Sequence, residues 1–391
     1  MFDAKRTIAD LVQSPLLAAI RQQIAPERII DDAIAIQQVA APTFDEGRRA
    51  ALVREQFARY TLKDISTDAV YNVYGRRPGQ HPDKPALLVS AHLDTVFPLE
   101  TDLAVRHAGE RIYGPGLGDN SLGVAGLLAL LNLFHTHEMH LPVDVWFVAN
   151  SREEGLGDLG GIRAVWETLG HQLGAAIVLE GMALGHIYHA GIAVRRLRIT
   201  CTAPGGHSWL HFGQASAIHS LMALGAEITS LTPPVQPRTT FNIGLISGGH
   251  SINSLATMAE LYLDLRSEET STLAALEQQV RDAIERLREP GVDFAVDVVG
   301  DRPAGSIPAD DPLVALAAAA LHTIDQDVAY ESGSTDANVL LANGLPTVTV
   351  GISRGGNAHR LDEYIETAPI ADGVWHLLLL ALAAANTVSE W

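Results

Sequence analysis

The sequence predicts an α/β protein in which a larger domain, built on a central mixed sheet flanked by helices, is interrupted by a smaller ferredoxin-like domain. Short runs rich in Val, Ile, Leu and Ala alternate with helix-like stretches. The pattern changes to β-α-β-β-α-β near Val194, and the first pattern returns near residue 305. Alternating strands and helices are typical of a sheet that is covered on both faces.

The first pattern contains runs with the composition of fully buried strands. They are residues 85–91, 143–150, 175–180 and 347–352, with an apolar helix expected over 121–134. The chain has 391 residues and is 47% apolar. It therefore exceeds the size at which one hydrophobic core usually stops growing, and two domains are expected.

The middle of the chain has the element order of a ferredoxin-like split unit. Strands are expected over 194–203, 239–247, 258–266 and 294–300, and helices over 214–231 and 271–289. We therefore expect the larger domain to be formed by 1–193 and 305–391. The inserted domain, 194–304, is expected to leave one sheet face or edge open and to act as a lid and in homodimerisation.

Composition excludes several classes of protein. The formal net charge of −19 and the lack of a basic stripe argue against a nucleic-acid partner. The single cysteine, Cys201, excludes an intramolecular disulfide. The N-terminal residues lack an apolar signal core, and no apolar run is expected to reach the roughly 20 residues of a membrane span, so we expect no membrane partner and a cytoplasmic protein.

Ionisable side chains follow the ends of the expected buried strands, where the loops of an open α/β sheet converge. Carboxylates and imidazoles crowded together repel or compete for protons, and bound cations are one remedy. Oxygen and nitrogen ligands without cysteine suit Zn²⁺, Co²⁺ or Mn²⁺. The residues concerned are His92, Asp94, Asp119, Glu153, Glu154, Glu180 and His359.

These residues lie in five short motifs, which occur in the order SAHLDTV, GLGDN, SREEG, VLEG and GNAHRLDE. In this order the motifs resemble those of the co-catalytic dizinc metallopeptidases, the family of aminoacylase, glutamate carboxypeptidase, acetylornithine deacetylase and succinyl-diaminopimelate desuccinylase. The resemblance covers nearly the whole chain. It implies a zinc-peptidase-like catalytic domain and two divalent metal ions, most consistent with zinc, with cobalt or manganese as alternatives.

The resemblance also implies a role for each residue. Asp94 is expected to fix the tautomer of the ligand His92, and the peptide bond after the bridging Asp119 is expected to be cis. Glu153 is expected to act as the general base. The metal ligands implied are His92, Asp119, Glu154, Glu180 and His359.

The inserted domain carries three further residues that the resemblance marks. His207, in PGGHS, is expected to polarise the scissile carbonyl, usually across a dimer. Asn253, in GGHSINSLA, and Arg266, in LDLRS, are expected to bind the substrate, Arg266 through a substrate carboxylate.

The function implied is hydrolysis of the amide bond in a small N-acyl amino acid or short peptide. The glutamate at position 180 resembles that of acylases and carboxypeptidases, whereas aminopeptidase-like members tend to have aspartate there. Two alternatives stay open: a tripeptidase-like aminopeptidase of the same family, and a metal-binding protein without catalysis. The sequence does not distinguish the acyl group or the amino acid accepted.

Overall fold

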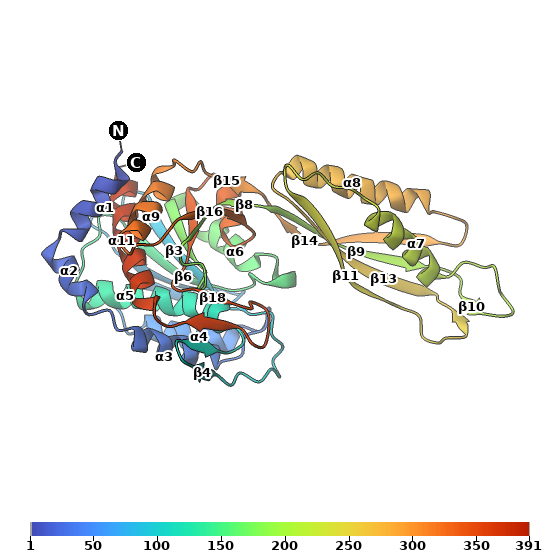
Figure 1. Ribbon diagram of the computed structural model, residues 1–391, viewed down its shortest axis with the longest axis horizontal. Helices are drawn as coiled ribbons and strands as arrows, with labels where there is room; N and C mark the ends of the chain where they lie inside the picture. Colours follow the sequence, from blue (N-terminus) through green and yellow to red (C-terminus); the bar gives the residue numbers. More distant parts are fainter. Residues whose placement is uncertain (1, 391) are drawn as a thin grey trace. The chain divides into compact units, whose positions relative to one another are not determined.

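The computed structural model describes residues 2–390 and divides the chain into two compact units (Figure 1). Unit 1 is formed by Met1–Gly191 and Gly305–Trp391, and unit 2 by Ile192–Ala304. The boundaries expected from the sequence, at residues 194 and 304, differ from these by at most two residues.

Unit 1 is built on a nine-stranded mixed sheet with the order β1-β2-β6-β3-β7-β17-β8-β15, in which β16 pairs with β8. The four central strands, β6, β3, β7 and β17, are parallel to their neighbours within this set. The strands of the sheet are β1 (Lys63–Thr67), β2 (Val73–Arg77), β3 (Ala86–His92), β6 (Val145–Asn150), β7 (Leu173–Leu179), β8 (His186–Gly191), β15 (Gly305–Ser306), β16 (Ala329–Gly333) and β17 (Thr347–Val350).

Helices cover both faces of this sheet because its central strands alternate between two apolar cores. In β3, Leu87 and Val89 belong to the larger core, and Leu88 belongs to the smaller one. The larger core is closed by α1 (Ala4–Val12), α2 (Pro15–Arg21), α3 (Pro26–Gln37), α4 (Gly47–Phe57), α5 (Leu122–Thr136), α9 (Pro312–His322) and α11 (Ile370–Ser389). The smaller core is closed by α6 (Gly160–Leu169) and α10 (Ala337–Ala342). The predicted fold class is confirmed.

A second, four-stranded sheet lies in unit 1 and has the order β18-β19-β5-β4. Its strands are β4 (Arg106–Ala108), β5 (Arg111–Tyr113), β18 (Gly355–Gly356) and β19 (Tyr364–Glu366). Because β5 and β19 pair, the segment just before Asp119 and the segment just after His359 lie side by side although they are far apart in the sequence.

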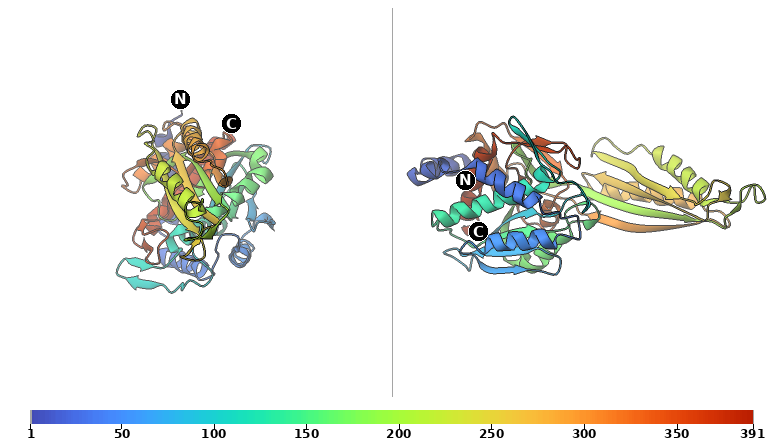
Figure 2. Two further views of the ribbon diagram at one scale, coloured as in Figure 1. Left: turned by 90° about the vertical axis from the view of Figure 1, so that its right-hand side faces the viewer. Right: turned by 90° about the horizontal axis from the view of Figure 1, so that it is seen from below.

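Unit 2 has the β-α-β-β-α-β order expected from the sequence, and its antiparallel sheet runs β11-β13-β9-β14. Helices α7 and α8 pack on one face of this sheet, over the alternating apolar residues of β9 and β13 (Figure 2). The elements are β9 (Ala193–Thr202), β10 (Gly206–His207), α7 (Ala217–Thr229), β11 (Thr239–Gly248), β12 (Ser254–Leu255), β13 (Met258–Ser267), α8 (Thr270–Arg286) and β14 (Asp293–Arg302).

The expectation that no apolar run reaches the length of a membrane span was wrong. Two helical stretches, Leu117–Thr136 and Ile370–Ser389, are 20 residues long and apolar enough to qualify by length and composition. In each, 83% of the apolar window is buried inside the protein. Both stretches therefore have the burial of core helices, which sequence length and hydropathy cannot distinguish from membrane spans.

Candidate metal centre

The predicted ligands lie where strands of the large sheet end. His92 is the last residue of β3, and Glu180 directly follows β7, which pairs with β3. Glu154 lies four residues beyond the end of β6, and Asp119 lies in the turn that leads into α5. Because parallel neighbours end at the same edge of a sheet, these side chains are brought to one edge.

The first group of possible ligands consists of His92, Asp119 and Glu180. The His92 Nε2 lies 3.1 Å from Asp119 Oδ1 and 3.6 Å from Glu180 Oε2. The His92 side chain is almost completely buried. Three ligand atoms at these separations are positioned to bind one cation.

The second group consists of Asp119, Glu154 and His359. The His359 Nε2 lies 3.2 Å from Asp119 Oδ2 and 3.1 Å from Glu154 Oε1. Asp119 therefore turns one carboxylate oxygen towards each group. A carboxylate shared in this way can bridge two cations, and the non-proline peptide bond that follows Asp119 is cis.

The separations fit the geometry of small divalent cations. Ligands held at 2.0–2.2 Å around a tetrahedral Zn²⁺ are roughly 3.3 Å apart, close to the values in both groups. Both groups contain only imidazole and carboxylate atoms, which suit Zn²⁺, Co²⁺ or Mn²⁺. The ligand residues present therefore fit a pair of such ions.

Protons and cations would compete for these groups. Burial raises the pKa of Glu154 and of Glu180 to about 7. Hydrogen bonds to Asp119 and Glu154 raise the pKa of His359 to about 10. Burial alone would raise the pKa of Asp119, but the imidazoles of His359 and His92 lower it below its usual value. Cations can take the place of the protons that hold these carboxylates and imidazoles together.

Asp94 lies at this edge but contacts more than His92. The His92 Nδ1 is 3.1 Å from the backbone oxygen of Asp94 and 3.5 Å from its carboxylate Oδ1. The two carboxylate oxygens accept hydrogen bonds from the backbone N–H groups of Glu153 and Glu154, each at 2.9 Å. Asp94 thus holds the paired glutamates in place in addition to orienting the imidazole, a role that the motif alone did not indicate.

The predicted base Glu153 is also buried at this edge. Its exposed fraction is 6%, and its backbone N–H donates to Asp94 Oδ1 at 2.9 Å. Asp336 was not among the predicted site residues. It is completely buried and accepts a hydrogen bond of 2.7 Å from Asn150 Nδ2, at the end of β6.

Two further buried side chains were missed from the sequence. Asn120 and Glu363 hydrogen-bond to the backbone around Asp119 and Glu180. Both stand inside quoted motifs, Asn120 one residue after Asp119 and Glu363 four residues after His359. Their position in the motifs was the available signal, but only the fold shows which backbone groups they reach.

In unit 2, His207 and Asn253 lie together at one end of the sheet. Strands β10 and β12 pair His207 with Ser254, and the Ser208 N–H donates to the Asn253 backbone oxygen at 3.0 Å. The His207 Nδ1 accepts from the backbone N–H groups of Trp209 and Leu210 at 3.2 and 3.4 Å. A neutral imidazole bonded in this way carries its hydrogen on Nε2, which makes Nε2 a donor.

Arg266 does not lie near His207 within unit 2. It occupies the opposite end of β13, where it pairs with Val194, whereas Met258, at the His207 end, pairs with Thr202. The eight residue-to-residue steps from Met258 to Arg266 span about 26 Å at the usual rise of a strand. A small substrate therefore cannot contact both side chains of one unit 2.

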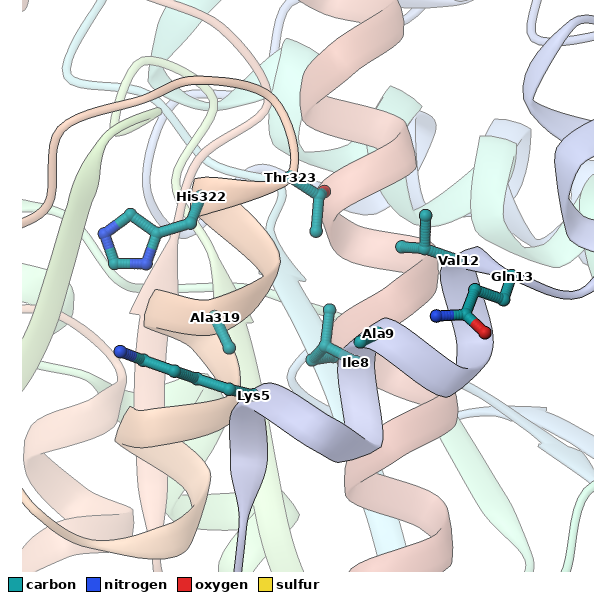
Figure 3. Close-up of a pocket in the computed structure, with 8 residues that line it drawn as sticks. All are labelled: Lys5, Ile8, Ala9, Val12, Gln13, Ala319, His322 and Thr323. Carbon is teal, nitrogen blue, oxygen red and sulfur yellow. The ribbon is translucent and has the colours of Figure 1, made fainter.

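A surface hollow of about 650 Å³ between α1 and α9 shares no residue with either ligand group (Figure 3). The side chains of Lys5 and His322 stand at one end of it, and an apolar wall is formed by Ile8, Ala9, Val12 and Ala319.

The α/β unit thus presents two imidazole–carboxylate groups that share one aspartate and are positioned to bind metal ions. The sequence matches peptidase family M20/M25/M40 over residues 88–383, which is more than half of the chain. The protein therefore belongs to this family, and the predicted resemblance is confirmed.

Individual relatives agree with this family. The chain is 26% identical over 300 residues to acetylornithine deacetylase of Salmonella arizonae, covering 72% of this chain and 76% of that protein. Its fold is similar to that of aminopeptidase PepT from Bacillus cereus, with a TM-score of 0.74, 19% identity and coverage of 92% and 99%. It is also similar to that of human carnosine dipeptidase 1, with a TM-score of 0.77, 13% identity and coverage of 95% and 99%.

Proposed function

We propose that the protein hydrolyses the amide bond of a small N-acyl amino acid or short peptide that carries a carboxylate, and that it uses two divalent cations, most consistent with zinc. The observation that carries this proposal is the shared Asp119, whose two oxygens face separate ligand groups. The first group would be completed by His92 and Glu180, and the second by Glu154 and His359.

The chemistry is divided among the side chains. A bound pair of divalent ions supplies Lewis acidity, which favours deprotonation of water and polarisation of a carbonyl. Glu153 accepts the proton of the attacking water as the new C–O bond forms, and delivers it to the nitrogen as the C–N bond breaks. The products are a carboxylic acid and an amine.

His207 and Arg266 are proposed to contact the substrate. The Nε2–H of His207 donates to the carbonyl oxygen as negative charge develops on it, an interaction typically worth about 3 kcal/mol. The Arg266 guanidinium, which already bonds Asp264 at 2.7 Å, retains further N–H groups that can bind a substrate carboxylate. Asn253, beside His207, is proposed to assist in binding.

The distance between His207 and Arg266 supports a homodimer. Because the two ends of β13 are about 26 Å apart, His207 and Arg266 of one chain cannot serve the same small substrate. We propose that each active site takes Arg266 from its own chain and His207 from a second copy. The edge strand β11 exposes Leu245 and Ile246, which gives a surface for pairing of two unit 2 sheets.

A substrate comparison tests the function. The protein, loaded with zinc, is assayed on N-acetyl amino acids and on di- and tripeptides with a free amine, before and after treatment with a chelator. The proposal expects hydrolysis of N-acyl amino acids that is lost on chelation and restored by added metal. Preference for free-amine tripeptides would favour the tripeptidase-like alternative, and no turnover with metal retained would favour a protein without catalysis. We also propose a cytoplasmic location, which fractionation of cells tests.

A further inference from the structure

One buried amide and one buried carboxylate side chain connect the Asp119 turn by hydrogen bonds to the segments that carry other ligands. Asn120 reaches the segment around Glu180, and Glu363 comes from the segment after His359. Asn120 is 1% exposed and Glu363 is 0% exposed. Asn120 therefore links the Asp119 turn to the segment of Glu180, and Glu363 links it to the segment of His359.

Asn120 uses both ends of its amide. Its Nδ2 donates to the backbone oxygen of Leu179 at 2.7 Å, and its Oδ1 accepts from the backbone N–H of Gly181 at 2.9 Å. The two bonds flank Glu180 on either side. The amide fits only because residue 123 is a glycine: a Cβ on Gly123 would lie 2.0 Å from Asn120 Oδ1.

Glu363 uses one carboxylate oxygen. Its Oε1 accepts from the backbone N–H groups of Gly118 and Asp119, at 2.7 and 2.9 Å. Glu363 lies four residues after His359, at the start of the segment whose strand β19 pairs with β5. The Glu363 backbone oxygen also accepts from Gly114 N–H at 2.9 Å, so side chain and backbone hold the same turn.

We propose that Asn120 and Glu363 are positioning residues that set the two cation sites separately, Asn120 the site of His92 and Glu180, and Glu363 the site of Glu154 and His359. This inference rests on the proposed pair of divalent cations. Neither side chain contacts a cation; each fixes the distance between Asp119 and one other ligand. Outer-shell partners of this kind typically change metal affinity by about 10- to 100-fold when they are removed.

The experiment measures Co²⁺ binding by visible absorption in two single-site backgrounds. His92→Ala leaves the site of Asp119, Glu154 and His359, and His359→Ala leaves the site of His92, Asp119 and Glu180. Glu363→Ala should weaken Co²⁺ about 10- to 100-fold in the first background, and by no more than about twofold in the second. Asn120→Asp, which loses the donor to Leu179, should show the reverse pattern.

Two matched variants separate positioning from general damage. Glu363→Gln keeps an oxygen that can accept from both N–H groups, so it should restore most of the affinity that Glu363→Ala loses. Gly123→Ala leaves Asn120 in the sequence but displaces its amide, so it should reproduce the effect of Asn120→Asp. Thermal melting of each metal-free variant shows whether the fold is retained.

The inference is supported if Glu363→Ala weakens Co²⁺ only in the His92→Ala background and Asn120→Asp weakens it only in the His359→Ala background. Equal weakening in both backgrounds, or no weakening in either, overturns it. If the single-site proteins bind Co²⁺ too weakly to measure, the two stepwise constants are measured with all five ligands present, and a change of the same constant by both variants overturns it. Binding of fewer than two Co²⁺ ions by the unaltered protein would instead contradict the proposed cation pair itself.

Discussion

The ligand edge of unit 1 and the His207 end of unit 2 are organised in opposite ways. In unit 1, His92, Glu153 and Glu154 are buried, and the loops around them are joined by Asp94, Asn120 and Glu363. In unit 2, His207 is exposed and is held by local hydrogen bonds within its own hairpin and the following turn. The fold of one chain thus orders the proposed cation site, whereas His207 is proposed to act on the active site of a second chain.

The largest effect is expected at the buried end. Glu153→Ala should lower kcat by about 10²- to 10⁴-fold, because it removes the proposed general base, while the protein keeps its metal content. Glu154→Ala is the matched control and should lose metal as well as activity. Turnover of Glu153→Ala within tenfold of the unaltered protein would show that this carboxylate is not the base.

The activity lost when His207 is replaced should be partly restored by a second chain that retains His207. His207→Ala should lose about 10²- to 10³-fold in kcat, since it removes a donor to the developing oxyanion. When it is mixed with Glu153→Ala and the subunits exchange, half of the dimers are mixed and each contains one complete site, so about one quarter of the original activity should return. Assays of the mixture that stay at the sum of the separate variants would contradict a site shared between chains.

The buried interior of unit 1 should also make the protein sensitive to acid. His376, in α11, is completely buried, and burial lowers its pKa from 6.5 to about 4. Between pH 6.5 and pH 4, His376 is protonated in the unfolded chain but stays neutral in the folded chain. The free energy of unfolding therefore falls as the pH falls towards 4. Between pH 7 and pH 5 this one group should cost about 2 kcal/mol. His376→Leu should reduce the shift of the melting temperature over that range; an unchanged shift would assign the acid sensitivity to other groups.

The smallest effect is expected on stability at the exposed end. Phe212 is 90% exposed, so Phe212→Ala should change the free energy of unfolding by less than about 0.5 kcal/mol. Phe147, fully buried in β6, is the matched control, and Phe147→Ala should cost about 3–5 kcal/mol. Denaturant unfolding at low protein concentration measures both. A large loss with Phe212→Ala would mean that the turn after His207 packs on the fold.

The buried end was also the easier one to predict from the sequence. The strand before His92 and the strand before Glu153 are continuous apolar runs, and charged residues at their ends stand out. Parallel strands bring the ends before His92 and Glu180 to one edge whatever the intervening sequence. Asp119 follows no such strand, and only the family resemblance of its motif grouped it with them.

The remaining features depend on distances that sequence does not carry. Glu363 and Gly118 are brought together by the pairing of β5 with β19, which no periodicity in either segment indicates. The separation of His207 from Arg266 follows from the register of β13 on β9, and only the structure gives that register. Short apolar runs predicted the buried strands, but the expectation that no apolar run reaches about 20 residues was wrong for α11. The burial of this helix inside unit 1 accounts for its apolar composition.

The most direct test of the central claim is anomalous diffraction at the zinc absorption edge from crystals of the zinc-loaded protein. If the protein binds a pair of zinc ions, we expect two peaks per chain, about 3.5–4 Å apart. One should lie beside His92 and Glu180 and the other beside Glu154 and His359, with the Asp119 carboxylate between them. A single peak, or peaks away from Asp119, would contradict it.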